Sequence, residues 1–259
     1  MTGEAIFIQD DDRFTPTDLA VGPWDPGALH GGAPAALLVH VLGAHPVDPA
    51  LRLARITYDF VRPAPLSELT ARVAVVRPGR RVAVLDAMLR DSDRNEVTRA
   101  RALLVAPSEL GESNREPLPF AGPEAATGND WQSPASRGFV ANAVEIRFVA
   151  GRFGEPGPAV AWFRLRYPLI AGRPIAPLER AAAAGDFGNG IASVLTWDEH
   201  VFINPDLTLY LEREPVGEWV AMQSVSSVSP GAIATSQSVL WDQTGRIGWA
   251  TQSLLVGRR

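Results

Sequence analysis

Along most of this chain, apolar and polar side chains alternate with the two-residue period of β-strands. In the first half, the alternation predicts strands at 55–61, 69–76, 82–89 and 97–105. In the second half, it predicts strands at 144–148, 163–167, 201–203, 208–213, 219–225, 232–241 and 248–256. Turn residues such as Pro78-Gly79 and Pro230-Gly231 separate neighbouring strands, which is typical of an antiparallel meander.

Two segments depart from this alternation and are predicted to be helices. The segment from His30 to Leu42 is apolar on nearly every side, and Pro34 suits the first turn of a helix, where its missing N–H is not needed. A helix of this kind is enclosed by other structure. A second, alanine-rich helix is predicted from about Ala176 to Ala184. Each half therefore combines one buried helix with a set of strands.

The two halves also resemble each other in sequence. The segment that begins at Arg62 corresponds to the one that begins at Arg213, and the segment at Arg101 corresponds to the one at Gln252. Both matches have the same offset of 151 residues. A constant long offset indicates the duplication of a whole unit. This alignment makes Arg101 the counterpart of Gln252.

Between the halves lies a segment of different composition. Residues 107–138 are rich in Pro, Gly, Ser, Glu and Asn and show little periodicity, which predicts a linker. A structureless loop of that length is unusual inside a compact domain, so we interpret it as a connection between two units. The predicted organisation is an N-terminal unit at 1–106, a linker at 107–138 and a C-terminal unit at 139–259.

Composition limits the possible functions. The chain is 46% hydrophobic and 20% charged, as in a folded protein with a sizeable core, and its net charge of −5 does not predict nucleic-acid binding. The absence of cysteine excludes disulfides, thiolate zinc sites and a cysteine nucleophile. We expect no cofactor and no metal site, because His40 and His45 have no acidic neighbour at ligand spacing. No signal peptide or long apolar run is visible, so we expect a cytoplasmic protein without membrane insertion.

Four segments carry a resemblance to a known family. They are Glu145-Ile146-Arg147 followed by Trp162-Phe163-Arg164, the alanine-rich helix leading to Gly185-Asp186-Phe187, the strand at 204–213, and Thr251-Gln252. Together they resemble the acyl-CoA thioesterase II family, double-hotdog enzymes of the thioesterase superfamily. The resemblance covers most of the chain outside the linker. It implies an α+β tandem hotdog, with two antiparallel sheets each wrapped around a central helix. It also implies hydrolysis of acyl-CoA to free acid and CoA, and a homodimer formed by pairing of sheet edges.

Asp186 corresponds to the family's aspartate, which the resemblance implies to orient the attacking water. The residue type supports this hypothesis independently. A carboxylate at the end of a helix made mainly of Ala and Leu would be partly desolvated, which raises its pKa and makes it a better base. The alternative is a helix-terminal aspartate whose oxygens are satisfied by backbone amides.

Asn204 and Gln252 are the other predicted catalytic residues. Asn204 falls where the family carries a hydroxyl residue that helps to hold the water, although Asn204-Pro205-Asp206 could also be a simple turn. Gln252 shares a strand face with Leu254 and Val256. If that face is inward, its amide needs partners, and Asp186 with a water would supply them. The alternative for Gln252 is a solvated strand edge.

His30-Gly31-Gly32 opens the first helix. Gly31 and Gly32 are predicted to bind substrate, because glycines at a helix start allow close approach to N–H groups that can polarise a carbonyl oxygen. They could equally serve to let the loop cross the sheet. For His30 we predict a packing role.

Two other functions fit parts of the pattern. A non-catalytic protein that binds acyl-CoA or fatty acyl groups could keep the same polar residues for packing around an acyl tunnel. A hotdog enoyl-CoA hydratase would need a catalytic histidine within a few residues of the aspartate. After Asp186, the first histidine is His200, which argues against hydration chemistry.

Overall fold

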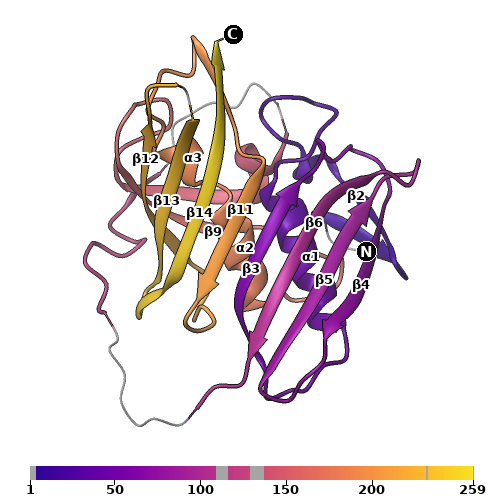
Figure 1. Ribbon diagram of the computed structural model, residues 1–259. Coiled ribbons are helices and arrows are strands. Elements are labelled where there is room, and N and C mark those ends of the chain that lie inside the picture. The colour runs from indigo at the N-terminus through magenta and orange to yellow at the C-terminus, as the bar shows by residue number, and fades with distance from the viewer. Residues whose placement is uncertain (1–3, 109–115, 129–136, 232, 259) are drawn as a thin grey trace.

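The computed structural model describes residues 4–108, 116–128, 137–231 and 233–258, and its main feature is one large antiparallel sheet (Figure 1). The strands of the first half are β1 (Phe7–Asp10), β2 (Arg13–Pro16), β3 (Arg52–Phe60), β4 (Leu69–Arg77), β5 (Val82–Arg90) and β6 (Glu96–Val105). Those of the second half are β7 (Thr127–Gly128), β8 (Val144–Ala150), β9 (Ala159–Leu165), β10 (His200–Ile203), β11 (Asp206–Leu211), β12 (Val220–Val228), β13 (Ile233–Asp242) and β14 (Gly245–Arg258). All of the predicted strands are present, while β1, β2 and β7 were not predicted.

The order of the strands is symmetric about the centre of the sheet. It runs β1-β2-β4-β5-β6-β3-β11-β14-β13-β12-β9-β8-β7, and β10 pairs with one end of β14. The order β3-β6-β5-β4 on one side of the β3–β11 junction is therefore matched by β11-β14-β13-β12 on the other. This arrangement is what a duplicated unit produces when its two copies join edge to edge.

The junction between β3 and β11 contains a residue pair with this repeat distance. β3 pairs with β11 so that Thr57 lies directly opposite Thr208, and their hydroxyl oxygens are 3.1 Å apart. These two threonines are separated by 151 residues, the offset found in the sequence. Each is therefore the counterpart of the other, and the approximate two-fold axis of the sheet passes between them.

The register also corrects one detail of the sequence alignment. Thr57 lies opposite Arg101 on β6, whereas its counterpart Thr208 lies opposite Thr251 on β14. The counterpart of Arg101 is thus Thr251, and that of Gln252 is Ala102, one residue away from the prediction. Because successive strand residues point to opposite faces, this single step matters: Arg101 is exposed, while Gln252 is buried.

Helices cover the inner face of the sheet (Figure 1). They are α1 (Gly32–Ala44), α2 (Pro177–Gly185) and the short α3 (Gly188–Ile191), which was not predicted. α1 packs mainly against β4, β5 and β6, and α2 against β9 and β12. Among the described residues, no helix is long and apolar enough to cross a membrane.

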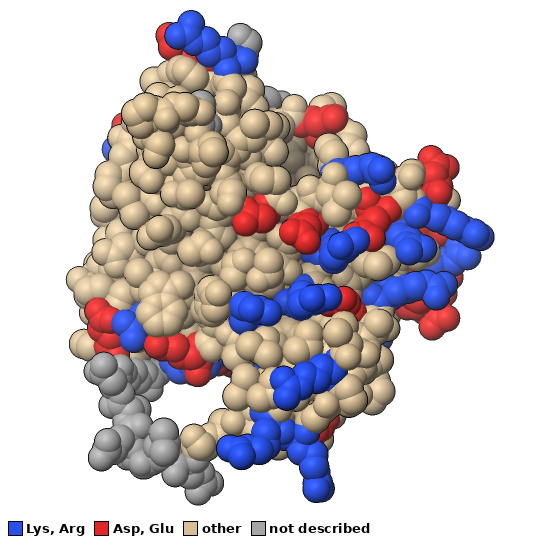
Figure 2. Space-filling view, viewed as in Figure 1, with Lys and Arg blue, Asp and Glu red and all other residues tan. Residues whose placement is uncertain are grey.

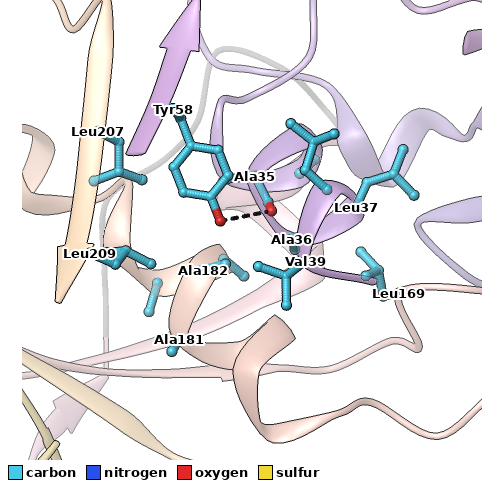
Figure 3. Close-up of a cluster of buried hydrophobic side chains, with 14 of the residues drawn as sticks. Ala35, Ala36, Leu37, Val39, Tyr58, Leu169, Ala181, Ala182, Leu207 and Leu209 are labelled. Atoms are coloured by element: carbon cyan, nitrogen blue, oxygen red, sulfur yellow. Dashed lines mark hydrogen bonds between the residues drawn. The ribbon is translucent and has the colours of Figure 1, made fainter. Parts of the chain in front are cut away.

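α1 and α2 also pack against each other at the centre of the molecule. Figure 3 shows Ala35, Ala36 and Val39 of α1 close to Ala181 and Ala182 of α2, where small side chains permit close contact. Above this contact, the hydroxyl of buried Tyr58 donates a hydrogen bond to the Ala35 carbonyl oxygen over 3.2 Å, while Leu207 and Leu209 pack from β11 (Figure 3). This packing fixes the C-terminal end of α2 relative to the N-terminal end of α1.

The described part of the predicted linker packs against the second half. Phe120 makes edge-to-face contacts with Trp162 and Trp241, at ring-centroid distances of 5.9 and 5.8 Å. The Trp162 indole N–H donates to the Ala121 carbonyl oxygen over 2.9 Å, and β7 pairs with β8. Residues 109–115 and 129–136 of the linker lie outside the described residues, and the predicted boundaries between units stay a prediction.

Candidate active site

Asp186 directly follows the last residue of α2 and is buried, with 6% of its surface exposed. Its Oδ1 accepts a hydrogen bond from Asn204 Nδ2 over 2.8 Å and a longer one from Gln252 Nε2 over 3.4 Å. The same Gln252 nitrogen lies 3.3 Å from the Asp186 carbonyl oxygen. The structure therefore brings together the three residues that were predicted to be catalytic.

The orientation of the Gln252 amide is set by its other end. Gln252 Oε1 accepts a hydrogen bond from the backbone N–H of Asn189 over 3.1 Å, so its N–H₂ group faces Asp186. Gly188 makes this possible, because a Cβ at that position would lie only 3.0 Å from Gln252 Oε1 and 2.9 Å from Ser238 Oγ. The inward face predicted for Gln252 is the observed one.

The other side of Asp186 is covered by the first half of the chain. His30 Nδ1 lies 3.2 Å from Asp186 Oδ2. A Cβ on Gly31 would lie 2.7 Å from the same oxygen, so only glycine permits this contact. Gly32 donates its backbone N–H to His30 Nδ1 over 3.0 Å, and a Cβ on it would meet the Ala183 carbonyl oxygen at 2.6 Å. Gly31 lines the adjacent cavity, whereas Gly32 is not among its lining residues.

His30 packs as predicted, but it also belongs to the surroundings of the carboxylate. Its ring is stacked between Phe139 and Phe187, at centroid distances of 5.0 and 4.6 Å. Burial lowers the pKa of His30 to about 3, so the ring is neutral near pH 7. The contact with Asp186 was missed because 156 residues separate the two and no periodicity connects them.

The environment of Asp186 changes its acidity. Burial raises the pKa of Asp186 from 3.8 to about 7, although hydrogen bonds from Asn204, the Gly32 amide and Gln252 favour the ionised form. A carboxyl group with a pKa near 7 is partly ionised at neutral pH, and its carboxylate is a much stronger base than that of an exposed aspartate. This is the value that suits a general base.

A cavity of about 390 Å³ adjoins these residues. Both halves contribute to its wall: Trp24, Leu29 and Phe60 come from the first, and Phe153 and Trp197 from the second. Trp24 and Trp197 are in contact at a centroid distance of 5.0 Å, and Phe153 packs edge-on against Trp197 at 6.0 Å. The polar and charged side chains in the lining are Asp25, His30, Arg62, Thr98, Asp186, Asn189 and Asn204.

This arrangement places a buried carboxyl group and an amide beside an apolar cavity of a size typical of small-molecule sites. Within the described ranges, no group of three or more His, Asp or Glu side chains is placed to hold a metal ion. The geometry suits activation of a water molecule against an electrophilic carbon held in the cavity.

Two protein-family models match the sequence. One is described as the acyl-CoA thioesterase N-terminal domain and matches residues 20–105. The other is described as the acyl-CoA thioesterase C-terminal domain and matches residues 117–256. The two matches meet in the region of the predicted linker. Among curated proteins, none matches the sequence significantly.

Several solved structures are similar to this one over nearly the whole chain. A candidate thioesterase II from Thermobifida fusca superimposes with a TM-score of 0.76 at 18% identity, covering 97% of this chain and 95% of that one. For a protein with a hot dog fold from Alicyclobacillus acidocaldarius, the TM-score is 0.72 at 17% identity, with 98% and 95% covered. For the acyl-CoA thioesterase II TesB2 from Mycobacterium marinum, it is 0.66 at 15% identity, with 97% and 94% covered. At these identities the similarity concerns the fold.

Proposed function

Because the chain belongs to the acyl-CoA thioesterase family, whose members hydrolyse acyl-CoA thioesters, we propose that Asp186 is the residue that activates the attacking water. The observation that carries this proposal is the buried carboxylate, with its pKa raised to about 7, at the wall of an apolar cavity. The ionised form accepts a proton from water as the water oxygen attacks the thioester carbonyl carbon.

The remaining steps need no further reactant. Attack by water forms a tetrahedral intermediate with a negatively charged oxygen, and the proton removed from water resides on Asp186. Collapse of the intermediate breaks the carbon–sulfur bond and releases the free acid. The CoA thiolate then takes the proton from Asp186, which returns the carboxylate to its starting state.

Asn204 and Gln252 position the base in this proposal. Both donate to Asp186 Oδ1, so they hold the carboxylate in one orientation. Asn204 also lines the cavity, and in this proposal its side chain contacts the water. Gly31, which lines the cavity at the N-terminal end of α1, brings the positive end of the helix dipole near the developing oxyanion.

The cavity lining indicates how acyl-CoA would lie. Its aromatic and aliphatic wall suits the acyl group, because an apolar chain gains free energy when it leaves water. Arg62 is exposed and lies in the lining, where its positive charge can contact the phosphates of CoA. A cytoplasmic location and a role in lipid metabolism complete this proposal.

We also infer that each half is one hotdog unit wrapped around its own helix, α1 in the first and α2 in the second. The mirrored strand order and the Thr57–Thr208 axis support this interpretation. The site then lies between the units, with the base from one and the covering His30-Gly31 segment from the other.

The decisive experiment is release of free thiol from acyl-CoA esters of two to eighteen carbons by the purified protein. We expect turnover with at least one ester, and we expect Asp186→Asn to lose roughly 10²-fold or more of it. Asp59→Asn, which changes an exposed carboxyl group on β3, is the matched control and should keep full activity. Binding of esters without turnover would favour the non-catalytic alternative, and a fully active Asp186→Asn protein would exclude Asp186 as the base.

A further inference from the structure

Three polar residues form a row across the inner face of the sheet, behind the candidate active site. The strand registers place Ser236 of β13 directly opposite Gln252 of β14, and Ser226 of β12 directly opposite Ser236. Ser236 and Gln252 are buried, with 1% and 3% of their surfaces exposed, and Ser226 is half-buried. We call these three residues the polar row. It begins at the amide that contacts Asp186 and crosses two further strands.

The duplication shows that the fold does not require this row. In the first half, the same registers place Leu85 opposite Ala102 and Val75 opposite Leu85, so the counterpart of the polar row is apolar throughout. On the outer face the contrast is the reverse, since charged side chains gather mainly over the strands of the first half (Figure 2). Burial of a hydroxyl group costs free energy unless it is hydrogen-bonded. Polar side chains at these positions in one copy alone therefore indicate a role that belongs to that copy.

The oxygen atoms of the polar row can accept or donate further hydrogen bonds. Both of its serine hydroxyls are buried, and neither has a hydrogen-bond partner within the described part of the chain. A second pair of serines on this face differs, because the hydroxyls of Ser224 and Ser238 bond to each other over 2.7 Å. Gln252 Oε1 accepts the Asn189 N–H, and an amide oxygen can accept two hydrogen bonds.

The spacing of the polar row suits bridging water molecules. Side chains directly opposite on neighbouring strands have Cβ atoms about 4.5–5.5 Å apart. A water molecule at about 2.8 Å from each of two oxygens can join oxygens up to about 5.6 Å apart, which covers this spacing. Buried waters typically bind to polar groups that otherwise lack partners.

The short helix α3 closes this part of the sheet, because it packs against β12, β13 and β14. Its first residue, Gly188, has no side chain to fill the space above the row. A Cβ on Gly188 would lie 3.0 Å from Gln252 Oε1 and 3.1 Å from Ser236 Oγ. These two oxygens therefore face the same point under α3.

We propose that the polar row binds ordered water molecules, one bridging Gln252 to Ser236 and one bridging Ser236 to Ser226. The first water donates to Gln252 Oε1 and adds to the bond from Asn189, so the amide is held with its N–H₂ group toward Asp186. Ser236 and Ser226 are then positioning residues, because they act on the carboxylate only through Gln252. The positioning role rests on the proposed function of Asp186, whereas the water sites do not depend on turnover.

A high-resolution crystal structure of the native protein tests the water sites directly. We expect one ordered water within about 3.2 Å of both Ser226 Oγ and Ser236 Oγ, and a second within that distance of Ser236 Oγ and Gln252 Oε1. Side chains of the row that bond directly to one another, or that have no ordered water between them, would overturn the proposal.

Kinetics test the positioning role. Ser236→Ala should lower kcat for acyl-CoA about threefold with KM unchanged, which is the scale of one hydrogen bond, and Ser236→Thr, which keeps the hydroxyl, should retain most of the native kcat. In a Gln252→Ala background, Ser236→Ala should have no further effect, because residues that act through one another are not additive. Ser224→Ala is the matched control, since it removes a buried hydroxyl from the same face outside the polar row, and it should leave kcat unchanged.

An equal effect of Ser236→Ala in the native and Gln252→Ala backgrounds would overturn the positioning role, and so would an equal loss of kcat in Ser224→Ala. Circular dichroism and thermal unfolding establish that each variant is folded. If Ser236→Ala does not fold, Ser226→Ala and Ser226→Thr, at the half-buried end of the row, replace the pair with the same expected results. If the native protein has no thioesterase activity, the proposed function fails, and the crystal structure still decides whether the polar row binds water.

Discussion

Replacing Asp186 by asparagine should inactivate the enzyme and at the same time stabilise it at alkaline pH. The unfolded chain exposes this carboxyl group, whose usual pKa is 3.8, whereas burial raises its pKa in the folded protein to about 7. The folded state therefore binds the proton more tightly than the unfolded state. By linkage, the free energy of unfolding falls as pH rises from about 4 to about 7, and it stays lowered above that range.

The size of the effect follows from the shift in pKa. Each unit corresponds to about 1.4 kcal/mol, so ionisation of Asp186 costs about 4 kcal/mol of stability at pH 8.5. At pH 5 the carboxyl group is protonated in the folded protein but ionised in the unfolded chain, and this difference lowers the stability by about 1.7 kcal/mol. Asparagine does not ionise, and its amide oxygen can still accept from Asn204 and Gln252. The stability of Asp186→Asn relative to the native protein should thus increase by roughly 2.5 kcal/mol between pH 5 and pH 8.5.

Urea unfolding at the two pH values measures this difference, and thiol release confirms the loss of activity. Asp242→Asn serves as the control. Burial acts to raise the pKa of Asp242, but hydrogen bonds from Arg213 and Thr244 hold this pKa at about 2. Asp242 is ionised at both pH values whether the chain is folded or unfolded, so its replacement should lower stability equally at both. A relative stability of Asp186→Asn that does not change with pH, or that decreases, would refute the assignment of a buried, proton-binding carboxyl group.

Four further outcomes are expected. The kcat/KM of the native enzyme should decrease as the pH falls through the pKa of Asp186, about 7, and should be about tenfold lower at pH 6 than on the alkaline plateau. A kcat/KM that does not change down to pH 5 would contradict Asp186 as the base. Gln252→Ala should lose roughly tenfold in kcat, less than Asp186→Asn, because it only positions the carboxylate. His30→Ala should lower the free energy of unfolding, measured in urea, by about 2 kcal/mol, because the contacts with two phenylalanine rings are lost. It should retain more activity than Asp186→Asn. If the two variants were equally inactive, the catalytic residues would lie in the His30-Gly31-Gly32 segment. Arg62→Gln should raise KM for acyl-CoA severalfold at low salt with little change in kcat, and an unchanged KM would remove Arg62 from the CoA site.

The strands and helices could be predicted because each has a strong local signal. Alternation in β5 or β13 and the apolar composition of α1 follow directly from which faces are buried. β1 and β2 were missed because they are only four residues long, too short for periodicity to be distinguished from chance. β7, which has only two residues, was missed for the same reason. It is a strand only because it pairs with β8, which lies further along the chain.

For the site, the residue types and their order could be predicted from the sequence, but not all of their contacts. Asp186, Asn204 and Gln252 were found through motifs of one half, and all three lie in that half. His30 was assigned only to packing, since nothing within its own segment reveals a carboxylate just after α2. The one-residue error in the counterpart of Gln252 has a similar origin. Sequence matching cannot detect a change of offset from 151 to 150 between strands, whereas the register of the sheet determines it.

The register also explains why a duplicated chain would hold one site of this kind, not two. The counterpart of Gln252 is Ala102, and the residue 151 positions before Asp186 is Ala35, so the first half has neither the base nor its amide partner. Yet the first half is not dispensable, because His30 and Gly31 lie against one side of the carboxylate and shield it from bulk solvent. Without that cover, the pKa of Asp186 would return toward its usual value and the base would weaken. In the proposed mechanism, the two halves are therefore complementary parts of one site: one supplies the acid–base chemistry, and the other supplies the burial on which that chemistry depends.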